Sequence, residues 1–542
     1  MLRLKSKYTW PLIISTLIVI RLLAAYLLPM TQDEAYYVTW GQHLDLGYLD
    51  HPPLIAWLSS IGNIWQGILG PFAHRLGGLM LSGVSGFFFW RLCSFAGLSV
   101  HAQILATILL FGTAAVALTN ILTTPDVAVF SLWIIALHEA AVAIEKKPKR
   151  WVSAGALAGL AMLGKYTAVL IPIIFLVALL ASKKEQLTTK WPYLGFATCL
   201  IVLSPHLIWN AHHNWTTFRF ILGRGIHESY EIYSESQSDL PLAQKPEKHG
   251  PEYIIAEQLL DPGDQPEARP DRSPLQKFER RLKNFFGGQL ALWGLTVFPL
   301  LSLLWSRRRS WRALIRITGT TSAESLLRAS VIVPLGFFGF VALFANVEAN
   351  WPSAYVIGCS VLLAPHLIDR KGMIIITSLG NMIILLFLTT LPLTYDKIPL
   401  PQSVQNNRVL KETTGYPELA TVVRHLDKAV CAETYQLASM MDFYQASRIC
   451  QWEGIARPSE WLRRASLNRI TRTDLEGSFY LLHVRRVPPA ISEFSPVKIT
   501  EYRDCADGKL YVTLGRQGQN YSNPCDKKTI HKWYLTEYKG NG

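Results

Sequence analysis

Long apolar runs alternate with short polar segments over the first 394 residues of the 542-residue chain. A helix of roughly 20 apolar residues can cross a bilayer core of about 30 Å. Several of the runs are short or contain glycine and proline, so the pattern predicts about 11 spans, in a range of about 11–13. The predicted spans lie near residues 10–29, 76–93, 102–119, 126–144, 151–163, 166–182, 191–209, 289–305, 329–346, 352–368 and 373–394. We therefore expect a polytopic α-helical membrane protein.

Two parts of different character follow from this pattern. Residues 1–394 form the predicted transmembrane domain, and residues 395–542 have the length of one small soluble domain. The second part mixes amphipathic helical stretches with short strand-like runs such as 478–484 and 509–514. It is predicted to be a small α/β domain.

Two longer polar loops interrupt the apolar runs, near residues 30–75 and 210–288. In the second loop, residues 229–274 are rich in Ser, Glu, Pro, Asp and Gln, which is typical of a poorly ordered segment or a lid. Residues 275–286 place Lys and Arg on one helical face and Leu and Phe on the other. This pattern predicts a helix that lies on the membrane surface.

The distribution of Lys and Arg predicts the orientation of the chain. Half of the residues are hydrophobic, and the formal net charge is +14. With the N-terminus in the cytoplasm, every basic cluster between the spans is cytoplasmic and the C-terminal domain is exported. The basic balance is thus explained by topology and anionic lipids, and no nucleic-acid partner is expected. The first span carries Arg21 and has no small-residue cleavage site, so it is predicted to be a retained anchor.

Cysteine positions agree with this orientation. Three cysteines lie in predicted spans, whereas Cys431, Cys450, Cys505 and Cys525 all lie in the predicted exported domain. Four cysteines in an oxidising compartment indicate two disulfides, with three possible connectivities. Among these we favour the pairing of nearest neighbours, 431 with 450 and 505 with 525.

The most informative polar stretch is residues 31–58, directly after the first predicted span. It begins with two adjacent acids, Asp33 and Glu34, and continues through several Tyr and Trp residues to Asp50 and His51. Acids and aromatic rings at the membrane boundary indicate a site for a polar group that is carried by a lipid.

At these residues the chain resembles a known family. The Asp-Glu pair and the later phrase GYLDHPPLIA resemble the polyprenyl-phosphate-sugar glycosyltransferases of the GT-C superfamily. These include protein mannosyltransferases and the aminoarabinose transferase of lipid A, and the phrasing is most similar to bacterial glycosyltransferase family 83. The similarity extends over roughly residues 1–450 and continues in order through TPD, GLAMLGKYTAVL, SPHLIWNAHHNWTTFRFILGRG, VEANWP and ETYQLASMMDFY.

The resemblance implies a function. The expected enzyme moves a hexose or pentose from a polyprenyl (undecaprenyl) phosphate donor to lipid A, lipopolysaccharide or another cell-envelope glycan. It is expected to be a monomer that works among the lipids of a bacterial inner membrane, with its active site on the periplasmic face and with inversion at the sugar. No nucleotide is expected, because the chain has no Walker-type loop.

Three acids are candidates for catalysis. Asp33 matches the family's catalytic aspartate, as a base or a stabiliser of positive charge, and Glu34 is its weaker partner. A structural alternative is that Asp33 only caps the following helix. The resemblance implies that Asp126 is a second acid of the site, although it could instead favour the dipole of its own helix.

Cationic residues are the candidates for holding the lipid phosphate. Lys165 lies between two apolar runs, where a charge is usually functional, although its side chain could also snorkel to the interface. Arg219 and Arg224 follow in FRFILGRG, and the flanking glycines make Arg224 the better candidate. Arg219 could instead pair with lipid headgroups.

The remaining candidates are polar residues on the same predicted face. They would bind sugar, acceptor or lipid phosphate, and the Glu-Asn pair could equally cap a helix: Tyr48, Asp50, His51, Glu348 and Asn350. No cofactor is assigned with certainty. Two carboxylates on one face could share a divalent metal ion, as in some relatives, but no dedicated ligand spacing is present.

Two other functions remain open from the sequence. Transfer to protein hydroxyls, as by the mannosyltransferase relatives, is one. A lipid or sugar transporter or flippase is the other, and such proteins often have repeated halves and charges deep within spans. Here no repeat is visible and the notable charges gather at one face, which favours chemistry at the membrane surface.

Overall fold

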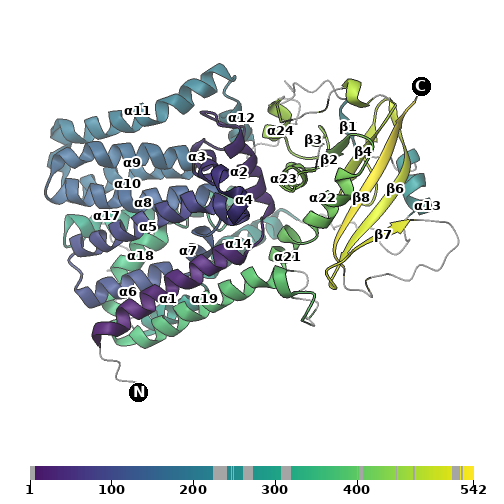
Figure 1. Cartoon of the computed structure of the whole chain (residues 1–542). Coiled ribbons are helices and arrows are strands. Elements are labelled where there is room, and N and C mark those ends of the chain that lie inside the picture. The colour runs from purple at the N-terminus through teal and green to yellow at the C-terminus, as the bar shows by residue number, and fades with distance from the viewer. Residues whose placement is uncertain are drawn as a thin grey trace.

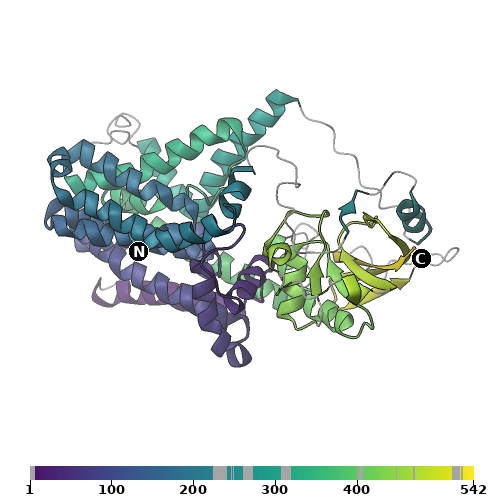
Figure 2. The same cartoon turned by 90° about the horizontal axis from the view of Figure 1, so that it is seen from above.

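The protein is described from a computed structural model. The described residues are 6–223, 241–245, 247, 250–259, 273–306, 319–398, 401, 404, 407–446, 449–464, 466–467, 470, 472–475, 477–514, 525 and 529–541. A bundle of long helices forms one part of the molecule, and a sheet with flanking helices forms the other (Figure 1). The same two parts lie side by side when the molecule is seen from above (Figure 2).

The helical part begins with α1 (Ser6–Leu27) and ends with α19 (Lys371–Thr394). Every predicted span corresponds to a helical segment. The helices between these two are α2 (Gln32–Gln42), α3 (Leu54–Ser60), α4 (Gln66–Leu69), α5 (Pro71–Phe95), α6 (Val100–Phe111), α7 (Ala114–Thr119), α8 (Pro125–Glu145), α9 (Trp151–Gly164), α10 (Leu170–Ser182), α11 (Lys190–His212), α12 (Thr216–Gly223), α14 (Pro274–Trp293), α15 (Val297–Ser306), α17 (Ser322–Phe344) and α18 (Tyr355–Leu363). Short 3₁₀ turns join some of them, such as η2 (Pro148–Arg150) and η3 (Tyr166–Val169).

Within the described residues, seven helical stretches are long and apolar enough to cross a membrane. Three shorter apolar helices accompany them, at residues 54–64, 100–111 and 166–182. The prediction of a polytopic helical membrane protein is confirmed, whereas the count of eleven spans is not. Two features account for most of the difference. The predicted spans 102–119 and 166–182 correspond to apolar helices of 12 and 17 residues, which are shorter than a membrane span, and the predicted spans 352–368 and 373–394 lie in one helical stretch, Tyr355–Thr394.

Helix α8 is the centre of the bundle. Its membrane-length window is fully buried, with α5, α9, α10 and α17 packed around it. Small residues let the neighbouring helices come close, because a Cβ atom on Gly155 of α9 would lie 1.8 Å from the carbonyl oxygen of Gly195 on α11. Close contact between small residues is a common way to join helices in a membrane, where apolar burial does not drive association. The N-terminus of α8 is thereby fixed where Asp126 stands.

The second part contains a mixed sheet of eight strands in the order β1-β5-β6-β8-β4-β2-β3, with β7 paired to β6. Strand β2 is parallel to β3 and β4, and the other pairs are antiparallel. The strands are β1 (Ala243–Gln244), β2 (Val430–Ala432), β3 (Ile449–Gln451), β4 (Ser478–His483), β5 (Ala490–Ile491), β6 (Phe494–Cys505), β7 (Leu510–Leu514) and β8 (Thr529–Gly540). The helices that accompany them are α13 (Pro251–Leu259), α21 (Arg408–Thr413), α22 (Tyr416–Arg424), α23 (Tyr435–Phe443) and α24 (Glu460–Arg463), with the 3₁₀ turn η9 (Arg472–Leu475).

The loop at 210–288 contributes to this sheet. Strand β1 pairs with β5, and α13 packs against β6. The expectation that residues 229–274 are poorly ordered is therefore wrong for β1 and α13, whereas a lid stays a prediction. Backbone pairing to a strand nearly 250 residues later stabilises the segment, and its own composition carries no sign of this.

A hydrophobic cluster joins the helical part to the sheet domain. It contains Tyr36, Trp40 and Tyr48 from the 30–58 stretch together with Tyr435 and Trp461 from the sheet domain. The rings of Tyr36 and Tyr435 lie 4.4 Å apart, and those of Trp40 and Tyr48 stack at 4.2 Å. Because both parts supply the same core, the 30–58 stretch is held between the membrane helices and the sheet domain.

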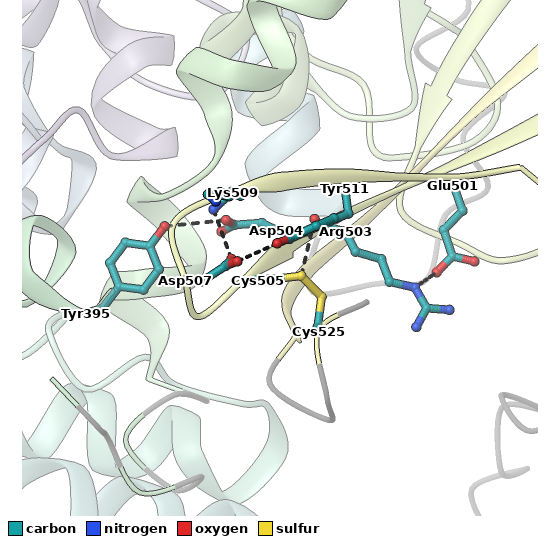
Figure 3. The surroundings of a disulfide bond; sticks show 9 residues. All are labelled: Tyr395, Glu501, Arg503, Asp504, Cys505, Asp507, Lys509, Tyr511 and Cys525. Carbon is teal, nitrogen blue, oxygen red and sulfur yellow. Dashed lines mark hydrogen bonds and ion pairs between the residues drawn. A yellow bond between two sulfur atoms is a disulfide. The ribbon is translucent and has the colours of Figure 1, made fainter. Parts of the chain in front are cut away.

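Near the other end of the sheet, Asp504 ties the end of the membrane bundle to the sheet (Figure 3). Its carboxylate accepts hydrogen bonds from Thr414 at 2.9 Å and from Tyr395, one residue past α19, at 3.4 Å. Burial raises the pKa of Asp504 to about 7, against the opposing effect of the Thr414 hydrogen bond. The adjacent Cys505 is linked to Cys525, next to this junction.

Both favoured disulfides are present, and the prediction of nearest-neighbour pairing is confirmed. Cys431 and Cys450 stand at paired positions of the parallel strands β2 and β3, and Cys505 is bonded to Cys525. The three cysteines of the membrane helices, Cys93, Cys199 and Cys359, are free.

We expect non-reducing peptide mapping of the native protein to recover the 431–450 and 505–525 pairs. Each closes a loop of about 20 residues, for which removal typically costs about 3 kcal/mol. The thiols of the membrane helices serve as the internal control and should react with a maleimide after unfolding without reduction. Recovery of all four tail cysteines as free thiols would contradict both the pairing and the exported position of the domain.

Candidate active site at the membrane boundary

The site begins at the first turn of α2, where the chain leaves the membrane. Thr31 is the N-cap of this helix, and its hydroxyl accepts a hydrogen bond from the Glu34 backbone N–H at 3.4 Å. Asp33 and Glu34 are consecutive, so their side chains leave the helix about 100° apart. As a result Glu34 is buried in the bundle, while Asp33 is partly exposed towards the sheet domain.

Glu34 is held by Arg75 of α5 in a buried ion pair. The guanidinium contacts both carboxylate oxygens, with distances of 2.8 Å from Nε and 2.6 Å from Nη2. The Thr123 backbone N–H and the Thr31 hydroxyl also donate to Glu34, at 2.8 and 3.1 Å. Burial alone would raise the pKa of Glu34, but the charge and hydrogen bonds of Arg75 outweigh it and leave the pKa lowered. Glu34 is therefore ionised, and its oxygens are occupied by protein donors.

Arg75 joins this pair to the end of α1. Besides Glu34, it donates to the carbonyl oxygens of Ala25, Leu28 and Pro29, at 2.7, 2.5 and 2.9 Å. All five N–H groups of a guanidinium are used in this way. The carbonyls at the end of a helix have no partner within it, and in a membrane protein they need one. Arg75 thus fixes the turn between α1 and α2.

Asp33 faces the sheet domain. Its carboxylate is hydrogen-bonded to Tyr435 at the start of α23 and lies within reach of the charges of Arg408 and Arg457. Burial raises the pKa of Asp33, and Asp50 adds to the rise, whereas both arginines and the Tyr435 hydrogen bond oppose it. The net pKa lies above the usual range for an aspartate, so Asp33 is a stronger base than an ordinary surface carboxylate.

Asp50 and Arg457 form the second charged pair. Asp50 is buried and accepts from the Arg457 guanidinium at 3.0 Å and from the Tyr36 hydroxyl at 3.2 Å. The Arg457 guanidinium also lies over the Tyr435 ring, 4.2 Å from its centre. Burial alone would lower the pKa of Arg457, but the charge of Asp50 outweighs it and holds the pKa above its usual range. The sheet domain thus supplies a fixed cation beside Asp33.

Three predicted site residues meet at the start of α8. Lys165, between α9 and η3, approaches one oxygen of Asp126 at 2.8 Å, and the Asn350 amide donates to the other at 3.0 Å. The Lys165 and Asp126 side chains are 12% and 18% exposed, so the pair is accessible at one edge. Residues more than 200 positions apart are thereby brought together at one face.

His51 lies between the two groups of charges. Its ring feels the charges of Asp50 and Arg457 on one side and of Lys165 and Asp126 on the other. Burial lowers the pKa of His51 to about 4, so the imidazole is neutral at neutral pH. Its buried Nδ1 has no hydrogen-bond partner in the described part of the chain. A buried polar atom of this kind usually meets a partner that is bound from outside.

The other predicted residues have different surroundings. Tyr48 is fully buried, and its hydroxyl accepts from the Asp45 backbone N–H and lies 3.1 Å from the His43 carbonyl oxygen, so it fits a packing role. Arg219 is exposed on α12, and Arg224 lies outside the described residues. Glu348 is exposed near the charge of Arg408.

A metal ion shared by Asp33 and Asp126 does not fit this geometry. Both oxygens of Asp126 are taken by Lys165 and Asn350. Across the described residues, no group of three or more His, Cys, Asp or Glu side chains is arranged to hold a metal ion. The site is therefore built from ion pairs and hydrogen bonds, and we derive no chemistry through a metal.

Sequence reasoning assigned no role to four residues of this region, namely Arg75, Arg408, Tyr435 and Arg457. Arg75 had a usable signal, because an arginine at the edge of an apolar run needs a partner. Tyr435 lies within ETYQLASMMDFY, a phrase that resembles the family but gives Tyr435 no particular role. Arg408 and Arg457 stand in soluble segments where arginine is ordinary, so only the folded structure places them at the site.

Comparisons with known proteins show similarity to membrane glycosyltransferases in part of the sequence. Residues 50–209 match the family model described as dolichyl-phosphate-mannose-protein mannosyltransferase. The lipid A galacturonosyltransferase RgtD of Rhizobium johnstonii is 29% identical over 196 residues, which cover 34% of this chain and 40% of RgtD. The match thus spans less than half of that relative.

Solved structures share the fold over nearly the whole chain. ArnT from Cupriavidus metallidurans bound to undecaprenyl phosphate superposes with a TM-score of 0.60 at 12% identity, covering 97% of both chains. Its apo state gives a TM-score of 0.56 with the same identity and coverage. The chain is thus a multi-pass helical membrane protein that shares the fold of ArnT, and residues 50–209 are similar to the mannosyltransferase family model.

We expect Glu34→Gln to destabilise the protein, because it removes the charge that compensates the buried Arg75. Loss of one partner of a buried ion pair typically costs about 3–5 kcal/mol. The measurement is thermal unfolding of the purified protein in detergent, which should show a fall of several degrees. Glu348→Gln removes an exposed carboxylate and is the matched control. Equal unfolding temperatures for wild type and Glu34→Gln would show that the ion pair is not structural.

Proposed function

We propose that the protein is an inverting glycosyltransferase that takes a sugar from undecaprenyl phosphate and places it on lipid A or a related lipid of the cell envelope. The acceptor hydroxyl attacks the anomeric carbon, the bond from that carbon to the phosphate oxygen breaks, and polyprenyl phosphate leaves. The hydroxyl proton passes to Asp33. The lipid donor is suggested by ArnT, which has been solved with undecaprenyl phosphate, and the acceptor by the partial match to RgtD.

The observation that carries this proposal is the environment of Asp33. A general base works best when its pKa is raised towards the working pH, and burial raises that of Asp33. Tyr435 is hydrogen-bonded to this carboxylate and lies beside it on the sheet domain. An aspartate that only capped α2 would not need these partners, and the capping hydroxyl belongs to Thr31.

Lys165 supplies the charge for the leaving group in this proposal. It stands at the membrane boundary, held 2.8 Å from Asp126, and is partly open to an incoming phosphate. A cation placed where negative charge develops on the departing phosphate lowers the barrier to transfer. Asp126 and Asn350 then act as positioning residues, because they hold the ammonium in place. We assign Arg219 and Arg224 a supporting role in attracting the lipid phosphate.

Asp50 and His51 are proposed to contact the substrate region. Asp50 keeps Arg457 beside Asp33, and the unpartnered Nδ1 of neutral His51 can take part in a hydrogen bond with a sugar or phosphate group. Glu34 is assigned a structural role. The arrangement also argues against alternating access, since the charged residues of the candidate active site gather at one end of the bundle rather than along a path through it.

The proposed location is the bacterial inner membrane with the site on the periplasmic face. The basic clusters 146–150 and 183–184 lie at the ends of the helices opposite the site, and positive charge marks the cytoplasmic side. The paired cysteines of the sheet domain favour the oxidising side for that domain.

The proposal is tested by mass spectrometry of lipid A and other envelope glycans from cells that lack the gene and carry either wild type or Asp33→Asn. Wild type should restore one added sugar, and Asp33→Asn should reduce its transfer by about 10²–10⁴-fold. Asparagine keeps the shape and loses the basicity. The variant should show unchanged expression and unfolding temperature.

Two outcomes would refute parts of this proposal separately. Near wild-type transfer by Asp33→Asn would remove Asp33 as the base. An unchanged lipid A accompanied by a sugar on envelope proteins would keep the reaction and replace the acceptor.

The pH dependence of transfer gives a second test. The base form of Asp33 is required, so kcat/KM should fall tenfold per pH unit below its pKa. Because that pKa is raised, the fall should begin at a higher pH than for an ordinary aspartate, whose pKa is about 4. Residual transfer by Asp33→Asn should lack this limb.

Asp504 provides the control for that profile. Its folded-state pKa of about 7 lies above the unfolded value, so its contribution to stability is present in acid and is lost as the pH rises through 7. A loss of stability caused by Asp504 would therefore appear as the pH rises, whereas the expected loss of rate caused by Asp33 appears as the pH falls. Asp504→Asn should leave the acidic limb in place, and a limb that moved with this variant would assign the titration to folding instead of catalysis.

A further inference from the structure

A cavity lined by charged and aromatic residues lies at the far end of α8 from the candidate active site. It has a volume of about 290 Å³ and is bounded by α5, α8 and η2. Asp126 is in the first turn of α8 and Lys146 follows its last residue, 20 positions later. At a rise of 1.5 Å per residue this separation is about 30 Å, the thickness of the bilayer core. The cavity therefore opens at the opposite membrane surface.

The rim of this cavity is basic. Arg91, Lys146, Lys147 and Arg150 line it, and all four side chains are exposed. Only Arg150 is ion-paired in the described part of the chain, with Glu139 at 3.0 Å. Lys146 lies over the Phe95 ring, 4.9 Å from its centre, and Arg91 over Phe87 at 5.8 Å. The Lys146 ammonium and the Arg91 guanidinium thus lie over aromatic rings at the exposed rim of the cavity.

The floor of the cavity contains a buried polar atom without a protein partner. His138 is 2% exposed, and its Nδ1 contacts the Glu139 carboxylate at 3.1 Å. Its Nε2 is buried and has no hydrogen-bond partner among the described residues. Glu139 is saturated, since Arg150 and the Ser153 hydroxyl occupy its second oxygen at 3.0 and 2.5 Å. The open position in the floor is therefore the Nε2 of His138.

We propose that this cavity binds the phosphate-bearing headgroup of an anionic lipid of the cytoplasmic leaflet. The four cations against one carboxylate give a net positive site. Because the Nδ1–H of His138 donates to Glu139, its Nε2 can accept a hydrogen bond from a glycerol hydroxyl that reaches the floor. Phe88 and Phe95, with ring centres 5.1 and 6.0 Å from that of His138, provide the apolar wall along which an acyl chain can lie. The basic residues of the rim are the ones whose charge assigns this end to the cytoplasm.

The site is separate from sugar transfer. It shares α8 with the candidate active site but none of its residues, and its occupancy does not depend on which donor or acceptor the enzyme uses. A bound headgroup here would hold α5, α8 and η2 together, because each supplies part of the cavity.

The test is native mass spectrometry of the full-length protein in detergent, titrated with phosphatidylglycerol and, separately, with phosphatidylethanolamine. Wild type should retain one phosphatidylglycerol at concentrations where phosphatidylethanolamine dissociates. The double variant Lys146→Gln/Lys147→Gln should weaken phosphatidylglycerol binding about 10- to 30-fold, from the loss of two surface cations.

The matched control is Lys149→Gln/Lys190→Gln. It removes the same charge at the same end of the bundle, from two lysines that lie over the Trp191 ring and do not line the cavity. Its affinity for phosphatidylglycerol should stay within about twofold of wild type. Equal weakening by the two double variants would show a diffuse surface charge and overturn the proposal.

His138→Phe probes the floor directly, since it keeps an aromatic ring and removes the nitrogen. It should weaken phosphatidylglycerol binding while leaving the preference for phosphatidylglycerol over phosphatidylethanolamine in place. Binding that is unchanged in this variant would exclude contact between the headgroup and the floor. Adding inorganic phosphate distinguishes a lipid site from a site for a soluble phosphate compound. If millimolar phosphate displaces the lipid, the ligand is a soluble phosphate compound and the lipid proposal is overturned.

Discussion

The buried ion pair of Arg75 and Glu34 is the constraint on which the active-site geometry depends. A guanidinium with five donors satisfies three carbonyls at the end of α1 and both oxygens of Glu34, so the chain can leave the membrane by only one path. Asp33, the residue directly before Glu34, then faces outwards. Neither residue of the pair could be removed alone without leaving a buried charge.

The site is assembled from both parts of the molecule. The membrane part supplies Asp33, Asp126 and Lys165, and the sheet domain supplies Tyr435 and Arg457. The hydrophobic cluster that contains Tyr36, Trp40 and Trp461 spans this boundary. Burial of the two parts against each other is therefore also what desolvates Asp33 and raises its pKa. The contact between the two parts therefore both forms the hydrophobic cluster and raises the pKa of Asp33.

The two ends of α8 carry different groups of polar residues. One end carries Asp126, paired with a lysine at the edge of the candidate active site, and the other carries the basic rim around His138 and Glu139. The helix is buried along its membrane length, and its titratable groups are Asp126 in the first turn and His138, Glu139 and Glu145 in the last eight residues. A lipid-phosphate chemistry on one face and a lipid-headgroup contact on the other are compatible with this arrangement.

The sequence by itself determined the class of the fold, the helical segments, the favoured pairing of the four tail cysteines and the stretch proposed to carry the chemistry. These depend on local patterns: apolar length, clustered Lys and Arg, cysteine position and the Asp-Glu pair after the first span. Only the tertiary structure decided what each polar residue does. Glu34 and Asp33 are adjacent and chemically alike, and the difference between a structural ion pair and a candidate base comes from Arg75 on one side and Arg457 on the other. Contacts between residues that are 40 to more than 400 positions apart leave no periodic trace in the chain, because they depend on how the helices and the sheet domain pack.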